Sequence, residues 1–222
     1  MKYGESTFDI IYLAFAIILG ICILKRQKDA IGKQMGSAVL ILGCGDAFHL
    51  VPRVLNYFIE ADFDAWLGFG KLVTSITMTV FYLLMYRIWL KVYKEREDRK
   101  LSLTLYVLVV LRIVLCLLPQ NGWLQNESSV LWGILRNIPF AAIGVIIVWL
   151  FWQKRTDVRK LRNVWILVTL SFVFYIPVAV AAGIVPMLGM LMLPKTVCYM
   201  LLIWAFWKYI HRPERLPESQ VK

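Results

Sequence analysis

Residues Gly43 to Tyr57, GCGDAFHLVPRVLNY, decide how the rest of this chain is interpreted. The stretch lies within an apolar run long enough to cross a bilayer, yet it carries Asp46, His49 and Arg53. Because these residues are three and four positions apart, their side chains share one face of a helix. Ionisable groups at membrane depth are costly and normally face a protein interior or a water-filled cavity. The stretch therefore predicts a membrane-spanning helix with one functional face.

The composition of the whole chain also indicates a membrane protein. Its 222 residues are 60% hydrophobic, and the mean hydropathy is +0.67. Soluble domains contain about 45–50% apolar residues, and here the excess falls in long runs. No polar linker is long enough to separate two domains. We therefore expect one seven-helix transmembrane domain over residues 1–211, followed by a disordered cytoplasmic tail over 212–222.

Seven apolar runs are each close to the length of about 20 residues that crosses a bilayer as a helix. The fold class that they predict is an all-α integral membrane protein, a seven-transmembrane-helix bundle. The predicted spans are residues 7–24, 36–59, 66–89, 101–118, 130–152, 164–185 and 187–210. The third connection, residues 86–100, is expected to continue the third helix into the cytoplasm, with Glu95 and Arg99 paired across one turn.

The connections between the spans set the expected orientation. The net charge of +11 would suit a nucleic-acid-binding protein, but the lysines and arginines gather in the short first, third and fifth connections and in the tail. On the opposite side the only basic residue outside the spans is Lys2, which stands near the acids Glu5 and Asp9. The positive-inside rule therefore places the N-terminus outside and the C-terminus in the cytoplasm. We expect a multi-pass plasma-membrane protein and no nucleic-acid partner.

Cations within the predicted spans all fall in the outer half of the membrane. The same spans contain one clear intramembrane acid, Asp46. A helical rise of about 1.5 Å per residue places Asp46 near the bilayer centre. The cations are Arg53, Lys71, Arg112, Arg136 and Lys195. Prolines within spans lie at similar depths, and because proline bends a helix, the helices are expected to splay around a cavity open to the outside. These prolines are Pro52, Pro139, Pro177 and Pro194.

The leading functional hypothesis is a basic cavity that binds an anionic small molecule or a lipid headgroup, for transport or sensing. Five cations and one acid cannot neutralise one another, so an anion is expected to complete the site. Asp46 and His49 would form the floor, as a gate or a proton-coupling pair. Besides the ligand, membrane lipids are the expected partners, and the oligomeric state is left open. The predicted ligand-binding residues are Arg53, Lys71, Arg112, Arg136, Asn137, Tyr175 and Lys195, with added hydrogen bonds from Thr74 and Ser75.

Two other hypotheses stay open. In an intramembrane lipid hydrolase or transferase, the catalytic pair would be His49 as general base and Asp46 as its orienting partner, while the arginines stabilise an oxyanion. The sequence has no GxSxG motif and no second catalytic carboxylate at short spacing. In a structural protein, Asp46 would pair with an arginine, and Arg53 and Lys71 would extend to the water boundary.

Neither a metal nor a cofactor is expected. His49 has no second histidine near it, because His211 lies at the other end of the last span. The seven-helix ceramidase-like hydrolases carry a histidine-rich zinc site, which this chain cannot supply. Lys195 on the last span resembles the retinal-binding lysine of rhodopsins. The third span has no intramembrane acid and Lys195 follows Pro194, so retinal is not expected.

Length and topology are similar to those of the small 3+1+3 transporters of the sugar and vitamin type. In such an arrangement Gly45–Pro52 would align with Leu170–Pro177, which superimposes the two prolines. Little else matches between the two halves, and we infer no internal repeat.

Overall fold

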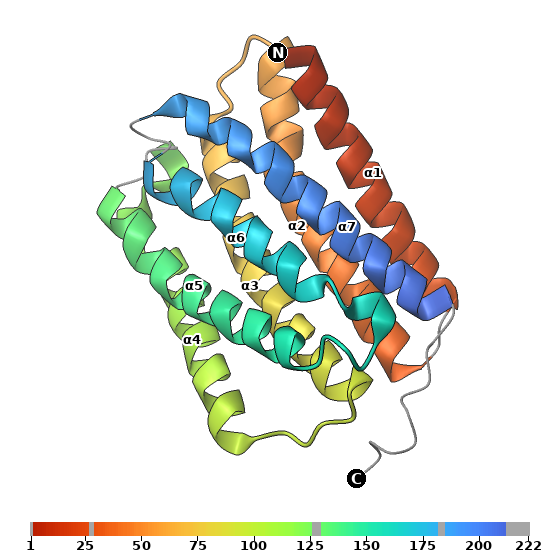
Figure 1. The fold of residues 1–222 in the computed structure, drawn as a ribbon. Coiled ribbons are helices and arrows are strands. Elements are labelled where there is room, and N and C mark those ends of the chain that lie inside the picture. The colour runs from red at the N-terminus through yellow and green to blue at the C-terminus, as the bar shows by residue number, and fades with distance from the viewer. Residues whose placement is uncertain (1, 27–28, 126–129, 182–184, 212–222) are drawn as a thin grey trace.

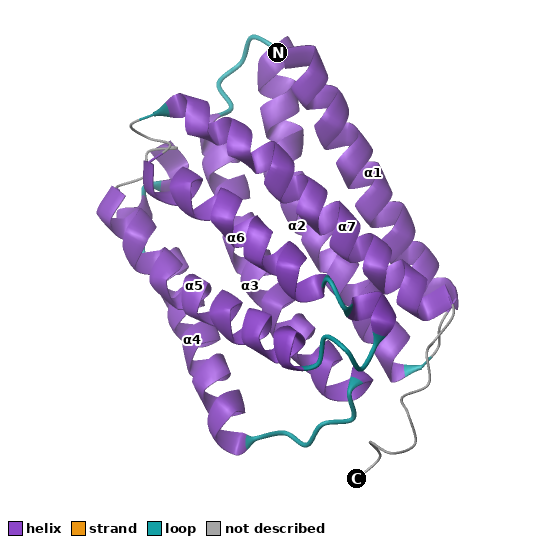
Figure 2. Cartoon of the chain, viewed as in Figure 1, coloured by secondary structure: helices purple, strands orange, loops and turns teal. Residues whose placement is uncertain are grey.

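Seven helices of the computed structural model are long and apolar enough to span a membrane (Figure 1). The structure describes residues 2–26, 29–125, 130–181 and 185–211, and within these ranges there is no strand (Figure 2). The expected tail, residues 212–222, lies outside the described residues. The long helices are α1 (Lys2–Arg26), α2 (Ala30–Phe58), α3 (Asp64–Val92), α4 (Arg99–Leu117), α5 (Val130–Gln153), α6 (Val164–Ala181) and α7 (Met192–His211). Four short 3₁₀ helices connect them: η1 (Pro119–Asn121), η2 (Trp123–Gln125), η3 (Arg159–Leu161) and η4 (Pro186–Leu191).

The predicted all-helical architecture with seven potential spans is confirmed, but two helix ends differ. The seventh span opens with the tighter η4, so its α-helix starts only at Met192. The expected extension of the third helix over residues 86–100 is wrong, because α3 stops at Val92 and Lys94 adopts a positive φ of 53°. α4 begins behind Asp98, whose side chain accepts a hydrogen bond from the Lys100 amide at 2.9 Å.

The predicted pair of Glu95 and Arg99 is also wrong. Glu95 lies in the connection between α3 and α4 and forms an ion pair with Lys154, 2.6 Å away at the end of α5. Lys154 lies 3.6 Å from Asp157 as well. These ion pairs join the α3–α4 connection to the α5–α6 connection. They favour a non-helical position of Glu95 over continuation of α3.

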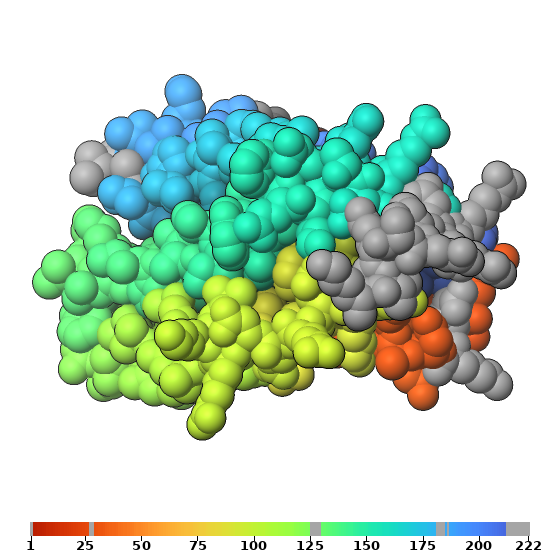
Figure 3. All heavy atoms as spheres, turned by 60° about the horizontal axis from the view of Figure 1, so that its bottom comes forward, coloured from red at the N-terminus to blue at the C-terminus, as the bar shows by residue number. Residues whose placement is uncertain are grey.

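The helices form a closed bundle in which chain neighbours pack side by side. α2 packs against α1 and α3, α5 against α4 and α6, and α7 against α6, while contacts between α7 and α1 close the ring (Figure 1). The end of α1 and the start of α2 lie at the same end of the bundle as the connections after α3 and α5, opposite the start of α1 (Figure 1). Drawn as spheres, the side chains of α4, α5 and α6 form one close-packed surface (Figure 3). Which end faces the cytoplasm stays a prediction.

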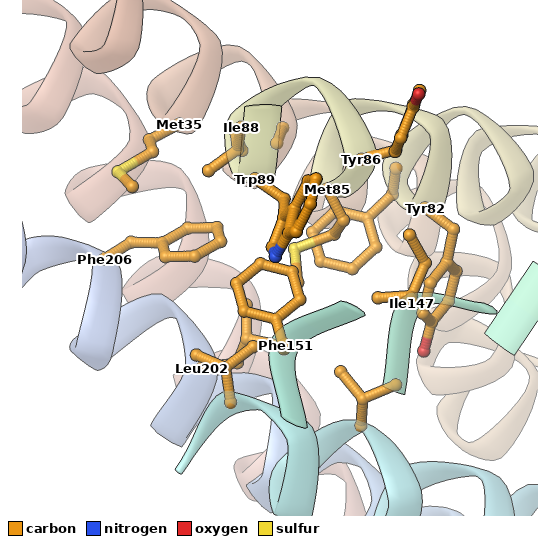
Figure 4. Close-up of a cluster of buried hydrophobic side chains, with 14 of the residues drawn as sticks. Met35, Tyr82, Met85, Tyr86, Ile88, Trp89, Ile147, Phe151, Leu202 and Phe206 are labelled. Carbon is orange, nitrogen blue, oxygen red and sulfur yellow. The ribbon is translucent and has the colours of Figure 1, made fainter. Parts of the chain in front are cut away.

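An apolar core runs through the bundle and includes the end near the connections after α3 and α5. Trp89 on α3 donates its indole N–H to the Leu150 carbonyl of α5 at 2.9 Å, which fixes these two helices within the core. Close packing of such side chains stabilises this end of the bundle. The buried cluster in Figure 4 includes Met35, Met85, Ile88, Ile147, Phe151, Leu202 and Phe206.

The contact between α2 and α3 depends on two glycines. A Cβ atom at Gly70 would collide with the Phe48 carbonyl oxygen, and one at Gly45 would collide with the Thr77 side chain. With no side chain there, the backbones approach closely enough for Thr74 Oγ1 to donate to the Gly45 carbonyl at 3.0 Å. This close approach places the polar face of α2 beside that of α3.

Candidate functional site

A cavity of about 420 Å³ borders the apolar core, and Met78 and Phe140 belong to both. Its walls come from every long helix except α1, together with η2. Among the described residues, no aspartate or glutamate lines it. The polar lining residues are His49, Lys71, Thr74, Ser75, Arg112, Arg136, Asn137, Tyr175 and Lys195. The structure therefore brings all the predicted ligand-binding residues together except Arg53.

Arg112 on α4 is the most deeply buried of the cations, with 1% of its surface exposed. Its Nη1 donates to the backbone carbonyl of Arg136 on α5. The guanidinium carbon lies 4.9 Å from the centroid of the Phe140 ring. Its Nε is buried and has no hydrogen-bond partner in the part of the chain that the structure describes. A buried donor without an acceptor is costly, so this group is prepared for an additional acceptor.

Arg136 is positioned by Asn121, a residue that we did not predict. Its Nη1 donates to Asn121 Oδ1 at 2.7 Å, and its guanidinium carbon lies 4.3 Å from the Trp123 ring centroid. The amide nitrogen of Asn121 in turn donates to the carbonyls of Leu115 and Leu118 at 2.8 and 2.9 Å. The end of α4 thus fixes Asn121, and Asn121 fixes the arginine at the cavity wall.

Lys195 lies near the start of α7 and is 9% exposed. Its ammonium nitrogen is 4.9 Å from the Tyr175 ring centroid and 5.3 Å from that of Tyr199. The Tyr175 hydroxyl donates to Asn137 Oδ1 at 2.8 Å, and the Asn137 amide nitrogen donates to the Gly133 carbonyl at 2.8 Å. These bonds order the polar wall that α5 and α6 present beside the lysine.

Aromatic faces, rather than carboxylates, hold three cations of this cavity. Within the described ranges, Arg112, Arg136 and Lys195 form no ion pair with an aspartate or glutamate. A cation–π contact contributes about 0.5–2 kcal/mol. Burial of an ion costs several kcal/mol even after relaxation of its surroundings. The aromatic contacts therefore offset only part of that cost, and no ion pair within the described ranges offsets the rest.

Arg53 is in a different place from the one we expected. It forms an ion pair with Glu5 on α1, and Tyr57 donates its hydroxyl to the same carboxylate at 2.9 Å. Glu5 belongs to α1, because that helix begins at Lys2, whereas the sequence suggested an acid outside the first span. The positive charge of Arg53 is thereby compensated away from the cavity.

The predicted pair of Asp46 and His49 is divided between two environments. Asp46 Oδ2 accepts a hydrogen bond from the Tyr12 hydroxyl at 2.6 Å, and Asp46 does not line the cavity. His49 does line it, and its buried Nδ1 has no hydrogen-bond partner among the described residues. Asp46 forms no ion pair with an arginine in those same ranges, although Lys195 is a charged neighbour.

Asp9 is a buried acid that we did not predict within the bundle. It lies on α1 with 4% of its surface exposed, and its Oδ2 has no partner in the described part of the structure. Its spacing of four residues from Glu5 and three from Tyr12 would have placed it on the same helical face. This spacing was the sequence pattern from which a position of Asp9 inside the bundle could have been predicted.

No protein family, curated protein or solved structure gives a significant match to this chain. No cluster of three or more histidine, cysteine or acidic side chains suited to a metal ion occurs in the described ranges.

Proposed function

We propose that the protein binds an anion in the cavity between Arg112, Arg136 and Lys195, for transport or sensing. The ligand is a phosphate or carboxylate, free as a small molecule or carried as the headgroup of a lipid. The observation that supports this most strongly is the convergence of four cations, these three and Lys71, on one cavity whose described lining contains no carboxylate. Charge-assisted hydrogen bonds from guanidinium and ammonium groups would hold such an anion.

The size and chemistry of the cavity narrow the ligand class. Pockets for small molecules measure about 300–1,000 Å³, and the present volume of about 420 Å³ falls in that range. Arg112 offers its free Nε, and Lys195 offers the hydrogen atoms of its ammonium group. Apolar lining residues such as Val178 and Met192 would contact the carbon skeleton of an organic anion.

The hydrolase or transferase hypothesis has less support. A general base acting through an aspartate needs that aspartate within hydrogen-bond reach of the histidine. Asp46 is instead bonded to Tyr12, and no hydrogen bond between Asp46 and His49 occurs among the described residues. We therefore assign His49 to the cavity wall and Asp46 to the contact between α1 and α2.

Thermal unfolding of the purified protein in detergent tests the proposal. We expect phosphate, butyrate or a phosphomonoester lipid to raise the unfolding temperature, since a ligand at one hundred times its Kd adds about 2.7 kcal/mol of stability. Arg136→Gln should abolish the response. Arg155→Gln is the matched control, because Arg155 also lies over a tryptophan ring, 4.7 Å from the Trp152 centroid, outside the cavity.

The same panel distinguishes the sources of the ligand. A response to phosphate or butyrate indicates a free anion, and a response to the lipid alone indicates a headgroup. Uptake of the labelled active anion into proteoliposomes would favour transport, and binding without uptake would favour sensing. An equal response of Arg136→Gln and the wild-type protein would contradict the proposal.

A further inference from the structure

The contact between α1 and α2 contains a buried carboxyl group that the anion site does not use. Glu5 pairs with Arg53 at the outer end of this contact, and Asp46 accepts from Tyr12 further in. Asp9 lies between these two interactions along α1. It is 4% exposed and its Oδ2 has no hydrogen-bond partner among the described residues.

Asp9 has few hydrogen-bond donors around it, although the charge of Arg53 on α2 acts on it. The groove of about 220 Å³ that it lines is otherwise formed by apolar residues, among them Leu13, Leu50 and Val54. Ser6, one turn away, is also 4% exposed and its Oγ has no partner in the described part. An ionised carboxylate without donors is costly in such a place, and buried carboxyl groups commonly bind a proton instead. The described residues offer no third ligand that would suit a metal ion.

Asp46 connects Asp9 to the anion cavity. The charges of Asp9 and Asp46 act on each other across the α1–α2 contact. Asp46 also interacts electrostatically with Lys195 of α7, which lines the cavity. When Asp46 is ionised, it offsets the charge of Lys195. When a proton binds to this pair of acids, one negative charge is lost and more of that positive charge acts on an anion in the cavity.

We propose that Asp9 and Asp46 form a proton-binding site, and that a proton is taken up there when an anion enters the cavity. The second half of this inference rests on the proposed function. A proton from water adds to a carboxylate oxygen when the anion binds, and it returns to water when the anion leaves. Linkage requires that each binding event favours the other by the same factor. The other titratable or charged groups near this site are Glu5 and Tyr12 on α1, His49, Arg53 and Tyr57 on α2, Lys71 on α3 and Lys195 on α7.

Infrared spectroscopy tests the proton site without any anion. A protonated carboxyl group has a C=O stretching band that an ionised carboxylate lacks. We expect such a band near neutral pH, its loss at higher pH, and its reduction in Asp9→Asn and Asp46→Asn. Glu60→Gln serves as control, because Glu60 is exposed in the α2–α3 connection. A spectrum without a pH-dependent band, or a band unchanged in both aspartate variants, would overturn the proton site.

Binding measurements at several pH values test the linkage. Sulfate and butyrate are the probes, because the charge of each is constant above about pH 6. Uptake of one proton predicts that their affinity falls by up to about tenfold per pH unit as the site ionises. Asp46→Asn should remove this dependence, and His49→Gln should retain it.

The two experiments fail in distinguishable ways. Anion binding that is independent of pH would overturn the linkage and leave the anion site intact. Loss of the pH dependence in His49→Gln, but not in Asp46→Asn, would also overturn it. If neither probe binds at any pH, the proposed function and the linkage both fail, while the carboxyl band still decides the proton site.

Discussion

Arg112 of α4 donates a hydrogen bond to the backbone carbonyl of Arg136 in α5, so two neighbouring cations are joined through the main chain of one of them. This arrangement keeps two like charges together at one cavity without an acid between them. Like charges repel, and the repulsion is relieved when an anion lies between them. Under the proposed function, the pair of arginines would favour anion binding at some expense to the stability of the empty protein.

Replacement of Arg112 by methionine distinguishes a binding role from a structural one. An apolar side chain of similar length removes a buried charge and its unpaired Nε. We expect Arg112→Met to change the free energy of unfolding of the empty protein by less than about 2 kcal/mol, and to abolish stabilisation by phosphate or butyrate. Arg112→Lys should retain part of the response. A loss of about 3–5 kcal/mol in the empty protein would instead indicate a closed structural network.

Gly70→Ala tests the close contact between α2 and α3. The added Cβ would meet the Phe48 backbone carbonyl, which cannot rotate away as a side chain can. We expect the free energy of unfolding to fall by about 1–3 kcal/mol, the usual cost of overpacking. Gly4→Ala is the control, since a Cβ there meets nothing within 4 Å. Equal unfolding temperatures for the two variants would show that this contact is looser than described.

The ion pair of Glu95 and Lys154 predicts a pH dependence at the other end of the bundle. The hydrogen bond to Glu95 raises the pKa of Lys154 above its ordinary value. A raised pKa in the folded protein means that the stabilisation is complete below the unfolded pKa of about 10.4 and is lost as the pH rises through the folded value. We expect Glu95→Gln to cost about 0.2–1 kcal/mol at pH 8.

This difference between Glu95→Gln and the wild-type protein should disappear in strongly alkaline solution. Thermal unfolding of both proteins over a pH series measures it. A difference that persists at every pH would show that the substitution acts through something other than the charge of Lys154.

The orientation follows from the distribution of basic residues and can be tested by cysteine labelling. Position 61 lies in the α2–α3 connection and position 97 in the α3–α4 connection, and both are exposed. We expect a membrane-impermeant maleimide to label Ala61→Cys in intact cells and Glu97→Cys only after the cells are opened. Labelling of the unsubstituted protein controls for its four native cysteines. The reverse pattern would invert the predicted topology.

The positions of the spans could be predicted because hydropathy over about 20 residues is a property of local sequence. The ends could not be predicted as well. The end of α3 depends on an ion pair between Glu95 and Lys154, residues far apart in the chain. The helical rise also predicts a depth for each cation, and these depths stay predictions. Which helix lies beside which cation could not be predicted.

The difference between Arg53 and Arg136 illustrates this limit. Both are arginines in the outer half of a predicted span, and both were expected at the cavity. Arg53 faces α1 and meets Glu5, whereas Arg136 faces Trp123 and Asn121. The neighbouring helix determines whether the charge of an arginine is compensated by an acid. The depth of a residue along its own span does not show which helix that neighbour is.

The most direct measurement of the central claim is a crystal structure of the protein with an anomalously scattering anion such as bromide or selenate. We expect an anomalous peak within hydrogen-bond reach of Arg136 and Lys195, and no such peak in crystals of Arg136→Gln grown with the same anion. Peaks confined to the basic connections at the ends of the bundle, with none between Arg112, Arg136 and Lys195, would contradict it.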